Sequence, residues 1–336
     1  MRLLVAVLLA LQMVSSPCLG LGSNSCPSVE GIVRSAVEAA LQQDIAIAAG
    51  LLRIFFHDCF PQGCDGSILL TGSGSEQQLA PNLTLQPRAL QLIEEIRAQV
   101  HAACGPTVSC ADITALATRD AVYASGGPSY AVSLGRLDSL APAPSSAVFQ
   151  LPQATSDAST LIGAFKSRNL SETDLVALSG GGHTIGRAHC SSFSNRFSFT
   201  SGDNSSSSAF VKKLAANCSS FPNRQQELDV ATPDVFDNNY FVNLQKGQGV
   251  LTSDQVLAGD WRTGWIVNGY AGNHWWFYDQ FRQSMIKLGN LKNTQQQQGE
   301  IRGSCYRPNN TPQSQSTQQT KLLELIHPDP AADYQQ

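Results

Sequence analysis

Apolar residues recur along most of this chain at the spacing that places them on one face of an α-helix. The clearest repeat, at i, i+3, i+4 and i+7, consists of Val29, Ile32, Val33, Ala36, Val37, Ala40 and Leu41. The same period predicts further helices over about 44–58, 88–103, 109–124, 156–168 and 273–289. Strand signals are few, and only the alternation of Tyr130, Val132 and Leu134 indicates one short strand or ribbon. The pattern predicts a mainly α fold with very little β.

Two helix starts carry a recognisable N-terminal signal. Ser109-x-x-Asp112 and Ser171-x-x-Asp174 resemble capping boxes, although both have Asp where Glu or Gln is usual. In such a box each of the two side chains accepts a hydrogen bond from the other residue's backbone N–H, so we expect a helix to begin at each motif.

The first 22 residues have the composition of a secretory signal peptide. Arg2 gives a basic start, Leu3–Leu11 is almost wholly apolar, and small residues follow up to Gly22. The apolar run is too short to span a bilayer, and no later stretch would span one either. An N-terminal core helix is the competing interpretation. Removal of 1–22 would also discard Cys18.

The C-terminal end differs in composition from the helical middle. From Arg307 onward the chain is rich in Gln, Ser, Thr and Pro, and only Leu322–Ile326 is apolar. We expect 307–336 to be disordered or removed by processing, because such a segment cannot bury enough apolar surface to fold. The serine-rich stretch 201–208 is expected to be a polar loop. The remaining 23–306 forms one large domain or two tightly fused lobes.

Charge and cysteine content restrict the partners and the compartment. The net charge of −4 and the pI of about 5.8 give no strong electrostatic basis for binding nucleic acid or membranes. Without Cys18 the chain keeps an even number of cysteines: Cys26, Cys59, Cys64, Cys104, Cys110, Cys190, Cys218 and Cys305. In a secreted chain this indicates disulfides, of which only Cys59–Cys64 can be paired from spacing. Zinc is the competing interpretation, but the chain has no CxxC pair. Glycosylation sequons lie at Asn82, Asn169, Asn204, Asn217 and Asn309.

Arg53 and His57 lie one turn apart on one face of the helix expected over 44–58. A base and a fixed positive charge facing one cavity suit a reaction in which a proton moves while negative charge develops on a leaving atom. A structural histidine is one competing interpretation, and a nucleophilic pair of His57 with Cys59 is another. The pair would need a free Cys59 thiol, which a nearby Cys64 in an oxidising compartment opposes.

Oxygen-bearing side chains surround the short step from Cys59 to Cys64, in which Gly63 permits a tight turn. They are Asp58, Asp65 and Ser67. Hard oxygen ligands in a short crosslinked loop suit Ca²⁺, with backbone carbonyls completing the shell. A solvated acidic turn is the competing interpretation.

His183 follows the run Gly180–Gly182 and opens an apolar segment, where its ring could be offered to a ligand other than water. Ser179 could be the nucleophile of a serine hydrolase, in a variant of the nucleophile elbow. That elbow needs a preceding strand, whereas Asp174–Leu178 has a helical pattern. A phosphate cradle would need a lysine after the glycines, and none is present.

These motifs together resemble the two signatures of secreted plant haem peroxidases (class III). Arg53–Ser67 resembles the distal signature, and Asp174–Gly186 resembles the proximal one. The resemblance runs from about Cys26 to Cys305, and it also includes Pro81-Asn82, Val108–Asp112, Gly126–Pro128, Leu134–Arg136, Phe236–Asn238 and Ser253–Gln255. It implies a haem peroxidase fold, in which haem b lies between two helical lobes.

The resemblance implies His183 as the axial iron ligand, with Asp254 accepting a hydrogen bond from the other ring nitrogen. On the opposite face, His57 would take a proton from hydrogen peroxide and return it to the leaving oxygen, while Arg53 stabilises the developing charge. Three further residues would complete the pocket. Asn82 would hold His57 in its basic tautomer, Phe56 would wall off the iron, and Pro152 would contact small phenolic reductants.

Two calcium sites are implied in the same way. The distal site would use Asp58, Asp65, Ser67, the carbonyls of Pro61 and Gly63, and Glu76 through water. The proximal site would use Thr184, Asp229, Thr232, Val235 (through its carbonyl) and Asp237. Since each site adjoins a histidine in sequence, loss of either ion should loosen the haem pocket.

The resemblance further implies four disulfides and one buried ion pair. The disulfides are Cys26–Cys104, Cys59–Cys64, Cys110–Cys305 and Cys190–Cys218. The ion pair joins Asp112 to Arg136, and its value lies mainly in the charge that would be stranded if it broke.

Two features of the chain bear on the match to the family pattern. Three glycines separate Ser179 from His183 where two residues are usual, and we expect the extra one to bulge before the helix that carries His183. Asn82 is both a sequon and the implied partner of His57; because the two roles exclude each other, we expect it to be unglycosylated.

The resulting prediction is a secreted, monomeric peroxidase of the cell exterior or wall, which uses hydrogen peroxide and phenolic donors. The C-terminal tail leaves a vacuolar destination open. A haem- or calcium-binding relative without turnover is the main alternative, and a serine hydrolase is the third.

Overall fold

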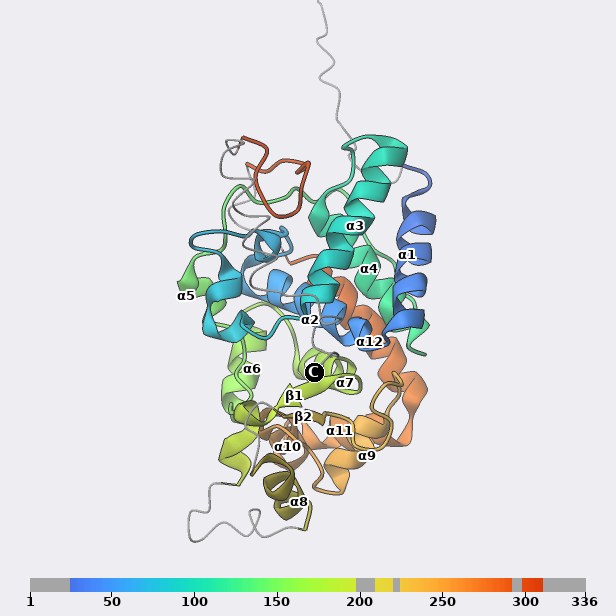
Figure 1. Ribbon diagram of the computed structural model, residues 1–336. Coiled ribbons are helices and arrows are strands. Elements are labelled where there is room, and N and C mark those ends of the chain that lie inside the picture. The colour runs from blue at the N-terminus through green and yellow to red at the C-terminus, as the bar shows by residue number, and fades with distance from the viewer. Residues whose placement is uncertain (1–24, 198–208, 220–223, 292–297, 311–336) are drawn as a thin grey trace, which may run out of the picture.

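A computed structural model describes residues 25–197, 209–219, 224–291 and 298–310 (Figure 1). The expected signal peptide 1–22, the 201–208 loop and all but 307–310 of the C-terminal tail lie outside the described residues. Within them, none of the helices has the length and apolar composition needed to cross a membrane.

The upper half of the molecule in Figure 1 is built mainly from α1 (Val29–Gln43), α2 (Ile47–Gln62), α3 (Pro87–Cys104) and α4 (Cys110–Ala124). α1 and α2 pack against α4, and α3 contacts all three. α1 buries a single apolar stripe, whereas most residues of α2 are buried. α2 is therefore the central helix of this half, which explains its nearly continuous apolar sequence.

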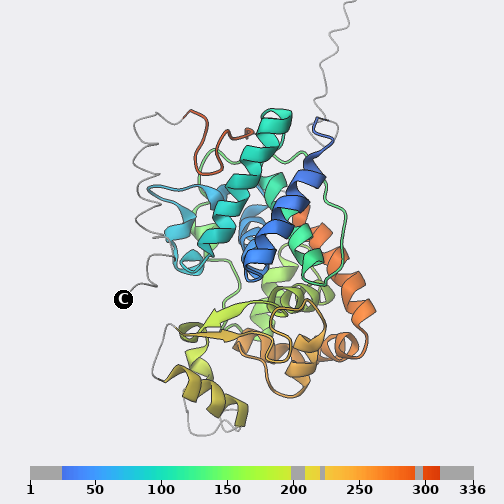
Figure 2. The same ribbon diagram turned by 45° about the vertical axis from the view of Figure 1, so that its right-hand side comes forward.

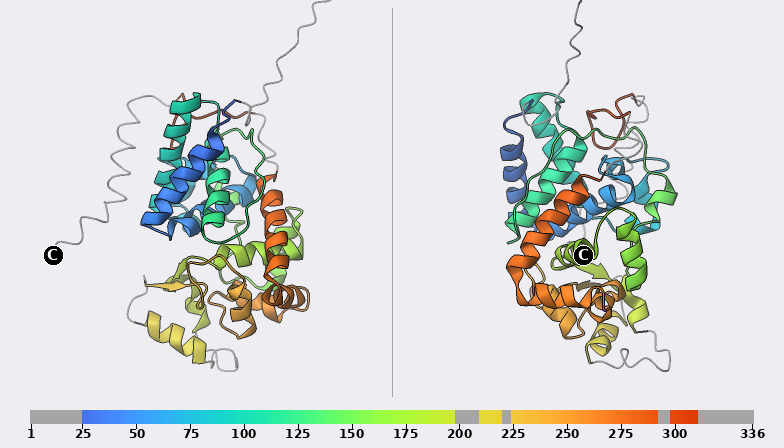
Figure 3. Two further views of the ribbon diagram at one scale, coloured as in Figure 1. Left: turned by 90° about the vertical axis from the view of Figure 1, so that its right-hand side faces the viewer. Right: turned by 180° about the vertical axis from the view of Figure 1, so that it is seen from behind.

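The lower half contains α6 (Ala158–Lys166), α7 (Glu172–His183), α9 (Asn239–Gln245), α10 (Thr252–Gly259) and α11 (Gly264–Gly272). The long helix α12 (His274–Gly289) contacts both α2 and α7, and Figure 3 shows it running along both halves. α2 and α7 also contact each other. The two helices that carry His57 and His183 therefore meet where the halves join.

Smaller elements complete the described chain. They are α5 (Ser145–Val148), α8 (Ala209–Cys218) and 3₁₀ helices at Ser67–Leu69, Glu76–Gln78, Ala80–Asn82 and Cys190–Arg196. β1 (Arg187–His189) and β2 (Gln225–Glu227) pair antiparallel, with Ala188 opposite Gln226 (Figure 2). The expectation of a mainly α fold with very little β is confirmed.

The strand expected from Tyr130 to Leu134 is wrong. In the described residues this segment pairs with no strand, and the N–H groups of Gly135 and Arg136 that follow it donate to the carboxylate of Asp112, at 2.6 and 3.3 Å. A side chain from α4 thus binds the backbone directly after this segment.

The two capping motifs differ in completeness. Ser171 and Asp174 form both bonds of the box at the start of α7. At the start of α4, Ser109 accepts from the N–H of Asp112, but the Asp112 carboxylate is engaged by Gly135 and Arg136 instead. The Arg136 guanidinium also lies 2.9 Å from Asp112, which gives the ion pair that the resemblance implies.

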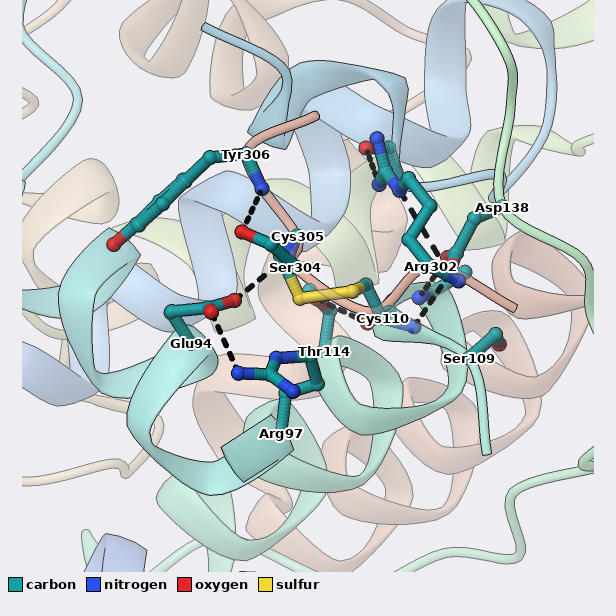
Figure 4. Close-up of a disulfide and its surroundings, with 12 residues drawn as sticks. Glu94, Arg97, Ser109, Cys110, Thr114, Asp138, Arg302, Ser304, Cys305 and Tyr306 are labelled. Carbon is teal, nitrogen blue, oxygen red and sulfur yellow. Dashed lines mark hydrogen bonds and ion pairs between the residues drawn. A yellow bond between two sulfur atoms is a disulfide. The ribbon is translucent and has the colours of Figure 1, made fainter. Parts of the chain in front are cut away.

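Four disulfides crosslink the fold, and they are the pairs that the resemblance implies: Cys26–Cys104, Cys59–Cys64, Cys110–Cys305 and Cys190–Cys218. Cys110–Cys305 spans 195 residues and ties the 298–310 segment to the start of α4 (Figure 4). The Cys305 N–H also donates to Glu94 of α3 at 2.7 Å. In the chain-entropy model a disulfide that closes a loop of this length stabilises the fold by about 5 kcal/mol.

Candidate active site

His57 on α2 and His183 at the end of α7 are each held through the ring nitrogen Nδ1. His57 Nδ1 lies 2.7 Å from Oδ1 of Asn82, and His183 Nδ1 lies 2.7 Å from Oδ1 of Asp254. In the described part of the chain neither Nε2 has a hydrogen-bond partner, and both residues are partly exposed. Each imidazole thus presents one free nitrogen, which can bind a metal or carry a proton.

Electrostatics keep the His57 ring neutral. Burial lowers the pKa of His57 to about 3, and the positive charge of Arg53 adds to this effect, while the bond to Asn82 opposes it. Asn82 is buried, and its Nδ2 donates to the carbonyl of Glu76 at 3.0 Å, so its Oδ1 faces His57. The oxygen accepts the Nδ1 proton and leaves Nε2 as the basic nitrogen. The burial of Asn82 also supports the expectation that this sequon carries no glycan.

The guanidinium of Arg53 is bound to the segment that carries Asn82. Nη1 donates to the carbonyl of Thr84 at 2.6 Å and to its hydroxyl at 3.0 Å, and Nη2 donates to the carbonyl of Pro81 at 3.0 Å. Burial lowers the pKa of Arg53 to about 10, so the group stays charged at neutral pH. No motif in the sequence identifies Thr84 as its partner.

Two expected pocket residues lie on different elements. Phe56 is partly exposed on α2, at 6.2 Å between ring centroids from His57, and stacks on Phe60 at 4.7 Å. Pro152 is partly exposed in the connection between α5 and α6, two residues before Ala154, whose carbonyl accepts from the N–H of Ser253 at 2.9 Å. The loop of Pro152 is thereby joined to α10.

Asp254 on α10 accepts two hydrogen bonds at one oxygen. His183 Nδ1 lies 2.7 Å and the Tyr240 hydroxyl 2.9 Å from Oδ1. Burial alone would lower the pKa of His183, but the charge and the hydrogen bond of Asp254 raise it above its ordinary value. A carboxylate partner makes an imidazole a stronger donor to a metal. Tyr240 was missed from the sequence; its only signal is its place two residues after Phe236–Asn238.

The bulge expected before the helix of His183 is wrong. α7 continues through Gly180–Gly182 to His183, and the N–H of Thr184 donates to the carbonyl of Gly180 at 2.8 Å, an i to i−4 bond. None of the three glycines has a positive φ, so the helix absorbs the additional residue without a left-handed turn.

At two of these glycines the absence of a side chain lets an aromatic ring pack directly on the helix backbone. A Cβ on Gly180 would lie 2.1 Å from Phe241, and one on Gly181 would lie 2.1 Å from Phe281. A Cβ on Gly182 would meet nothing within 4 Å. Aromatic rings therefore pack closely on the end of α7 at Gly180 and Gly181, whereas the space beside Gly182 is open.

Three buried acids lie close together beside the distal histidine: Asp58, Asp65 and Glu76. Oδ1 of Asp58 and Oε2 of Glu76 are buried and have no hydrogen-bond partner in the described residues. Burial and the repulsion of Asp65 and Glu76 raise the pKa of Asp58 well above its ordinary value, and burial also raises the pKa of the other two. The second oxygen of Asp58 and that of Glu76 each accept a backbone hydrogen bond, from Gly66 and from Ala143. Leaving the other carboxylate oxygen buried without a partner is unfavourable, and a cation would remove that penalty.

The other residues expected as ligands of the distal calcium lie close to these acids in the sequence. Pro61 is in the last turn of α2, Gly63 follows that helix with a φ of 103°, and Ser67 donates its N–H to Asp65 at 3.1 Å. Within the described ranges no three His, Cys, Asp or Glu side chains form a group that could hold a metal ion by themselves. Carbonyl and hydroxyl oxygens would therefore have to contribute ligands.

The residues expected to form the proximal calcium site begin directly after His183 in the sequence and continue in 229–237. They are Thr184, Asp229, Thr232, Val235 and Asp237. The Thr184 hydroxyl donates to the carbonyl of Asp237 at 2.9 Å and lies 3.5 Å from Asp229. Asn239, not expected from the sequence, donates to both Asp237 and Thr232. Burial raises the pKa of Asp229, and the charge of Asp237 adds to this. The oxygen chemistry and the repulsion between the acids again fit a hard cation.

Ser179 does not form a nucleophile elbow. It lies inside α7, which begins seven residues earlier at Glu172. An elbow needs a sharp turn between a strand and a helix, so the local fold removes the basis of the serine-hydrolase interpretation.

Comparison with known proteins agrees with the two motifs. The family model described as Peroxidase matches residues 33–273. The chain is 47% identical to cationic peroxidase SPC4 of Sorghum bicolor over 84% of this chain and 79% of that protein. It is 47% identical to peroxidase 12 of Arabidopsis thaliana over 84% and 80%, and 43% identical to peroxidase 66 of Zea mays over 91% and 95%.

The chain belongs to the peroxidase family, among the plant class III enzymes that its histidine motifs resemble. It is accordingly an oxidoreductase that uses hydrogen peroxide, and the family implies a haem cofactor. The residues present fit that group, since two partly exposed imidazoles offer free nitrogens from the two helices that meet between the halves.

Proposed function

We propose that this protein is a haem b peroxidase that reduces hydrogen peroxide while phenolic donors each lose one electron. His183 would hold the iron through Nε2, and His57 would act from the other side. The pair of contacts at Nδ1 carries the proposal, because a carboxylate partner suits a metal ligand and an amide partner suits a neutral base. Bound haem would supply the redox chemistry that breaks the O–O bond and draws electrons from the donors.

His57 would accept a proton at Nε2 from one oxygen of hydrogen peroxide and return it to the oxygen that leaves as water. Its low pKa keeps the nitrogen free at working pH, and the amide of Asn82 fixes the tautomer. Arg53 would stabilise the negative charge on the leaving oxygen. It can do so because its guanidinium stays positively charged at neutral pH.

Phe56 would exclude water and donors from the space above the iron, so that donors react at the haem edge. Pro152 would contact a phenolic donor there. Phe56 and Pro152 are both partly exposed, which is unusual for a phenylalanine on the central helix. Their exposure supports a place for both residues on the wall of a pocket.

We propose calcium at both oxygen clusters. The distal ion would be bound by Asp58, Pro61, Gly63, Asp65 and Ser67, with Glu76 through water. The proximal ion would be bound by Thr184, Asp229, Thr232, Val235 and Asp237. The oxygens of Asp58 and Glu76 that lack a hydrogen-bond partner are the main support for the distal site. The main support for the proximal site is the raised pKa of Asp229.

The mature enzyme is proposed to be a secreted monomer made of 23–306, after loss of 1–22. Four disulfides suit an oxidising compartment and support this. The 307–336 tail would be processed or would direct the protein to the vacuole, and localisation of a tagged protein distinguishes the two.

A guaiacol assay with hydrogen peroxide tests the function. We expect turnover in the unchanged protein and a loss of about 10²–10⁴-fold in His57→Leu. His101→Gln, on α3, is the matched control and should keep its rate. A protein that binds haem but turns over no faster than His57→Leu would instead be a binding relative without activity. Inactivation by a serine-directed phosphonate would revive the hydrolase alternative.

A further inference from the structure

All four tryptophans of the chain are concentrated in one short surface region. They lie between residues 261 and 276, on α11, the start of α12 and the turn before α11. Their exposed fractions are 85% for Trp261, 56% for Trp265, 70% for Trp275 and 37% for Trp276. Indole is the largest apolar side chain and is usually well buried, so a cluster of exposed indoles marks a functional surface.

A continuous series of aromatic contacts joins this surface to the proximal histidine. The distances between consecutive ring centroids are 6.3 Å for His183–Tyr240, 5.1 Å for Tyr240–Phe241, 5.2 Å for Phe241–Tyr270, 4.9 Å for Tyr270–Trp276 and 6.2 Å for Trp276–Trp265. The series runs from the end of α7 through α9 to α11 and the start of α12; α11 contacts both α9 and α12, and α9 and α11 lie in the lower half of Figure 1.

The rings of this series are held in place. Tyr240, Phe241 and Tyr270 are buried. A Cβ on Gly269 would lie 1.9 Å from the Trp276 ring, so α11 has a glycine where the indole packs. The side chain of Asn273 accepts a hydrogen bond from the backbone N–H of Trp276 at 3.1 Å and so caps the start of α12. Closely spaced aromatic rings in fixed positions, most of them tyrosine or tryptophan, favour electron transfer.

We propose that Trp265, together with Trp276, is a second oxidation site for phenolic donors too large to enter the pocket, such as phenol-bearing polymers. The proposal rests on the proposed peroxidase function, which supplies the oxidant. Tyr270 and Tyr240 relay the electron inward from the indoles.

The electrons and protons balance in this scheme. Each hydrogen peroxide takes up two electrons and two protons and gives two molecules of water. Each electron leaves the indole of Trp265, whose radical cation releases its Nε1 proton to water. A phenol at the surface then gives back one electron and one proton and becomes a phenoxyl radical, while the relay rings end unchanged.

The favoured path contains one phenylalanine, Phe241, between its two tyrosines. The route from Trp275 passes through Tyr278, Phe277 and Phe241, and so places two consecutive phenylalanines before Tyr240. Phenylalanine is much harder to oxidise than tyrosine or tryptophan, which assigns the site to Trp265 and Trp276. Trp261 has no aromatic ring contact among the described residues and is the natural control.

The test uses the haem-loaded full chain with hydrogen peroxide and two donors, guaiacol and a phenol attached to a long polyethylene glycol chain. We expect the double variant Trp265→Phe/Trp276→Phe to lose about tenfold or more of its rate with the polymer and to keep its rate with guaiacol. Tyr270→Phe should give the same pattern, because it interrupts the relay but leaves the surface and the ring packing intact. Trp261→Phe should change neither rate.

A second readout does not depend on turnover. With peroxide and a nitroso spin trap but no donor, mass spectrometry should find the trap on Trp265 or Trp276, not on Trp261, and the amount should fall in Tyr270→Phe. Equal polymer rates in all variants, or no trap on either indole, would overturn the proposal while guaiacol turnover persists. Absence of guaiacol turnover in the unchanged protein would overturn the peroxidase function and the relay with it.

Discussion

The Tyr240 hydroxyl lies 2.9 Å from Oδ1 of Asp254, the same carboxylate oxygen that accepts the bond from His183. The two donors share one acceptor, so each weakens the bond that the other can form. We therefore expect Tyr240 to moderate how strongly Asp254 would make a metal-bound His183 electron-donating.

Tyr240→Phe and Asp254→Ala should change the proximal bond in opposite directions. Without the hydroxyl, Asp254 binds His183 more strongly, and the iron–histidine stretching frequency of the reduced haem protein should rise. Without the carboxylate it should fall, and activity should drop by about 10–100-fold. Resonance Raman spectra of both variants check this, and equal frequencies in the two would contradict it.

Arg53→Leu should move the acid limb of the pH profile to higher pH. The charge of Arg53 is one of the causes that lower the pKa of His57, after burial. Its removal raises that pKa, so the base becomes protonated at less acidic pH. The profile of kcat/KM for hydrogen peroxide reports the pKa of the free enzyme. In the unchanged protein the rate should fall only as pH approaches about 3. If the acid limb of Arg53→Leu lies at the same pH as that of the unchanged protein, the limb belongs to a group other than His57.

Asp58→Asn should make the protein less dependent on calcium. The folded pKa of Asp58 is raised above 3.8, so without a cation the native state holds a proton that the unfolded state releases, and stability falls as pH rises above about 3.8. The neutral amide removes this loss and also a calcium ligand. With a chelator present at neutral pH, thermal unfolding should occur at a higher temperature in Asp58→Asn than in the unchanged protein; with calcium the order should reverse. Identical curves with and without chelator in the unchanged protein would refute the distal site.

Gly181→Ala and Gly182→Ala form a matched pair on α7. The first places a Cβ 2.1 Å from Phe281, whereas the second meets nothing within 4 Å. Gly182→Ala should stabilise the protein by up to about 1 kcal/mol, because alanine is the better helix former. Gly181→Ala should lower the free energy of unfolding and disturb the haem spectrum, because Phe281 or the end of α7 must move. Equal denaturant midpoints for both variants would contradict the close packing.

Local patterns were sufficient for a helix with one clear apolar stripe and for one with a nearly continuous apolar sequence. The repeat of α1 and the apolar sequence of α2 identified both helices, and the spacing from Arg53 to His57 followed from helix geometry. α11 escaped prediction because Gly264–Gly272 contains three glycines and has no such stripe. The false strand at Tyr130–Leu134 arose because alternation does not reveal that Asp112, on another element, binds the backbone that follows.

The partners of the two histidines were not accessible to local reasoning. Asn82 is 25 residues from His57 and Asp254 is 71 residues from His183, separations at which no periodicity operates. Family resemblance supplied both. Tyr240 and Thr84 matched no quoted motif and were missed, and the course of α7 through Gly180–Gly182 depends on Phe241 and Phe281, which lie far away in the chain.

The most direct test is the ferric optical spectrum of the haem-reconstituted protein and of His183→Ala. We expect the Soret and charge-transfer bands of five-coordinate high-spin iron in the unchanged protein, their loss in His183→Ala, and their return when imidazole is added. An unchanged spectrum in His183→Ala would contradict the assignment of the iron to this residue.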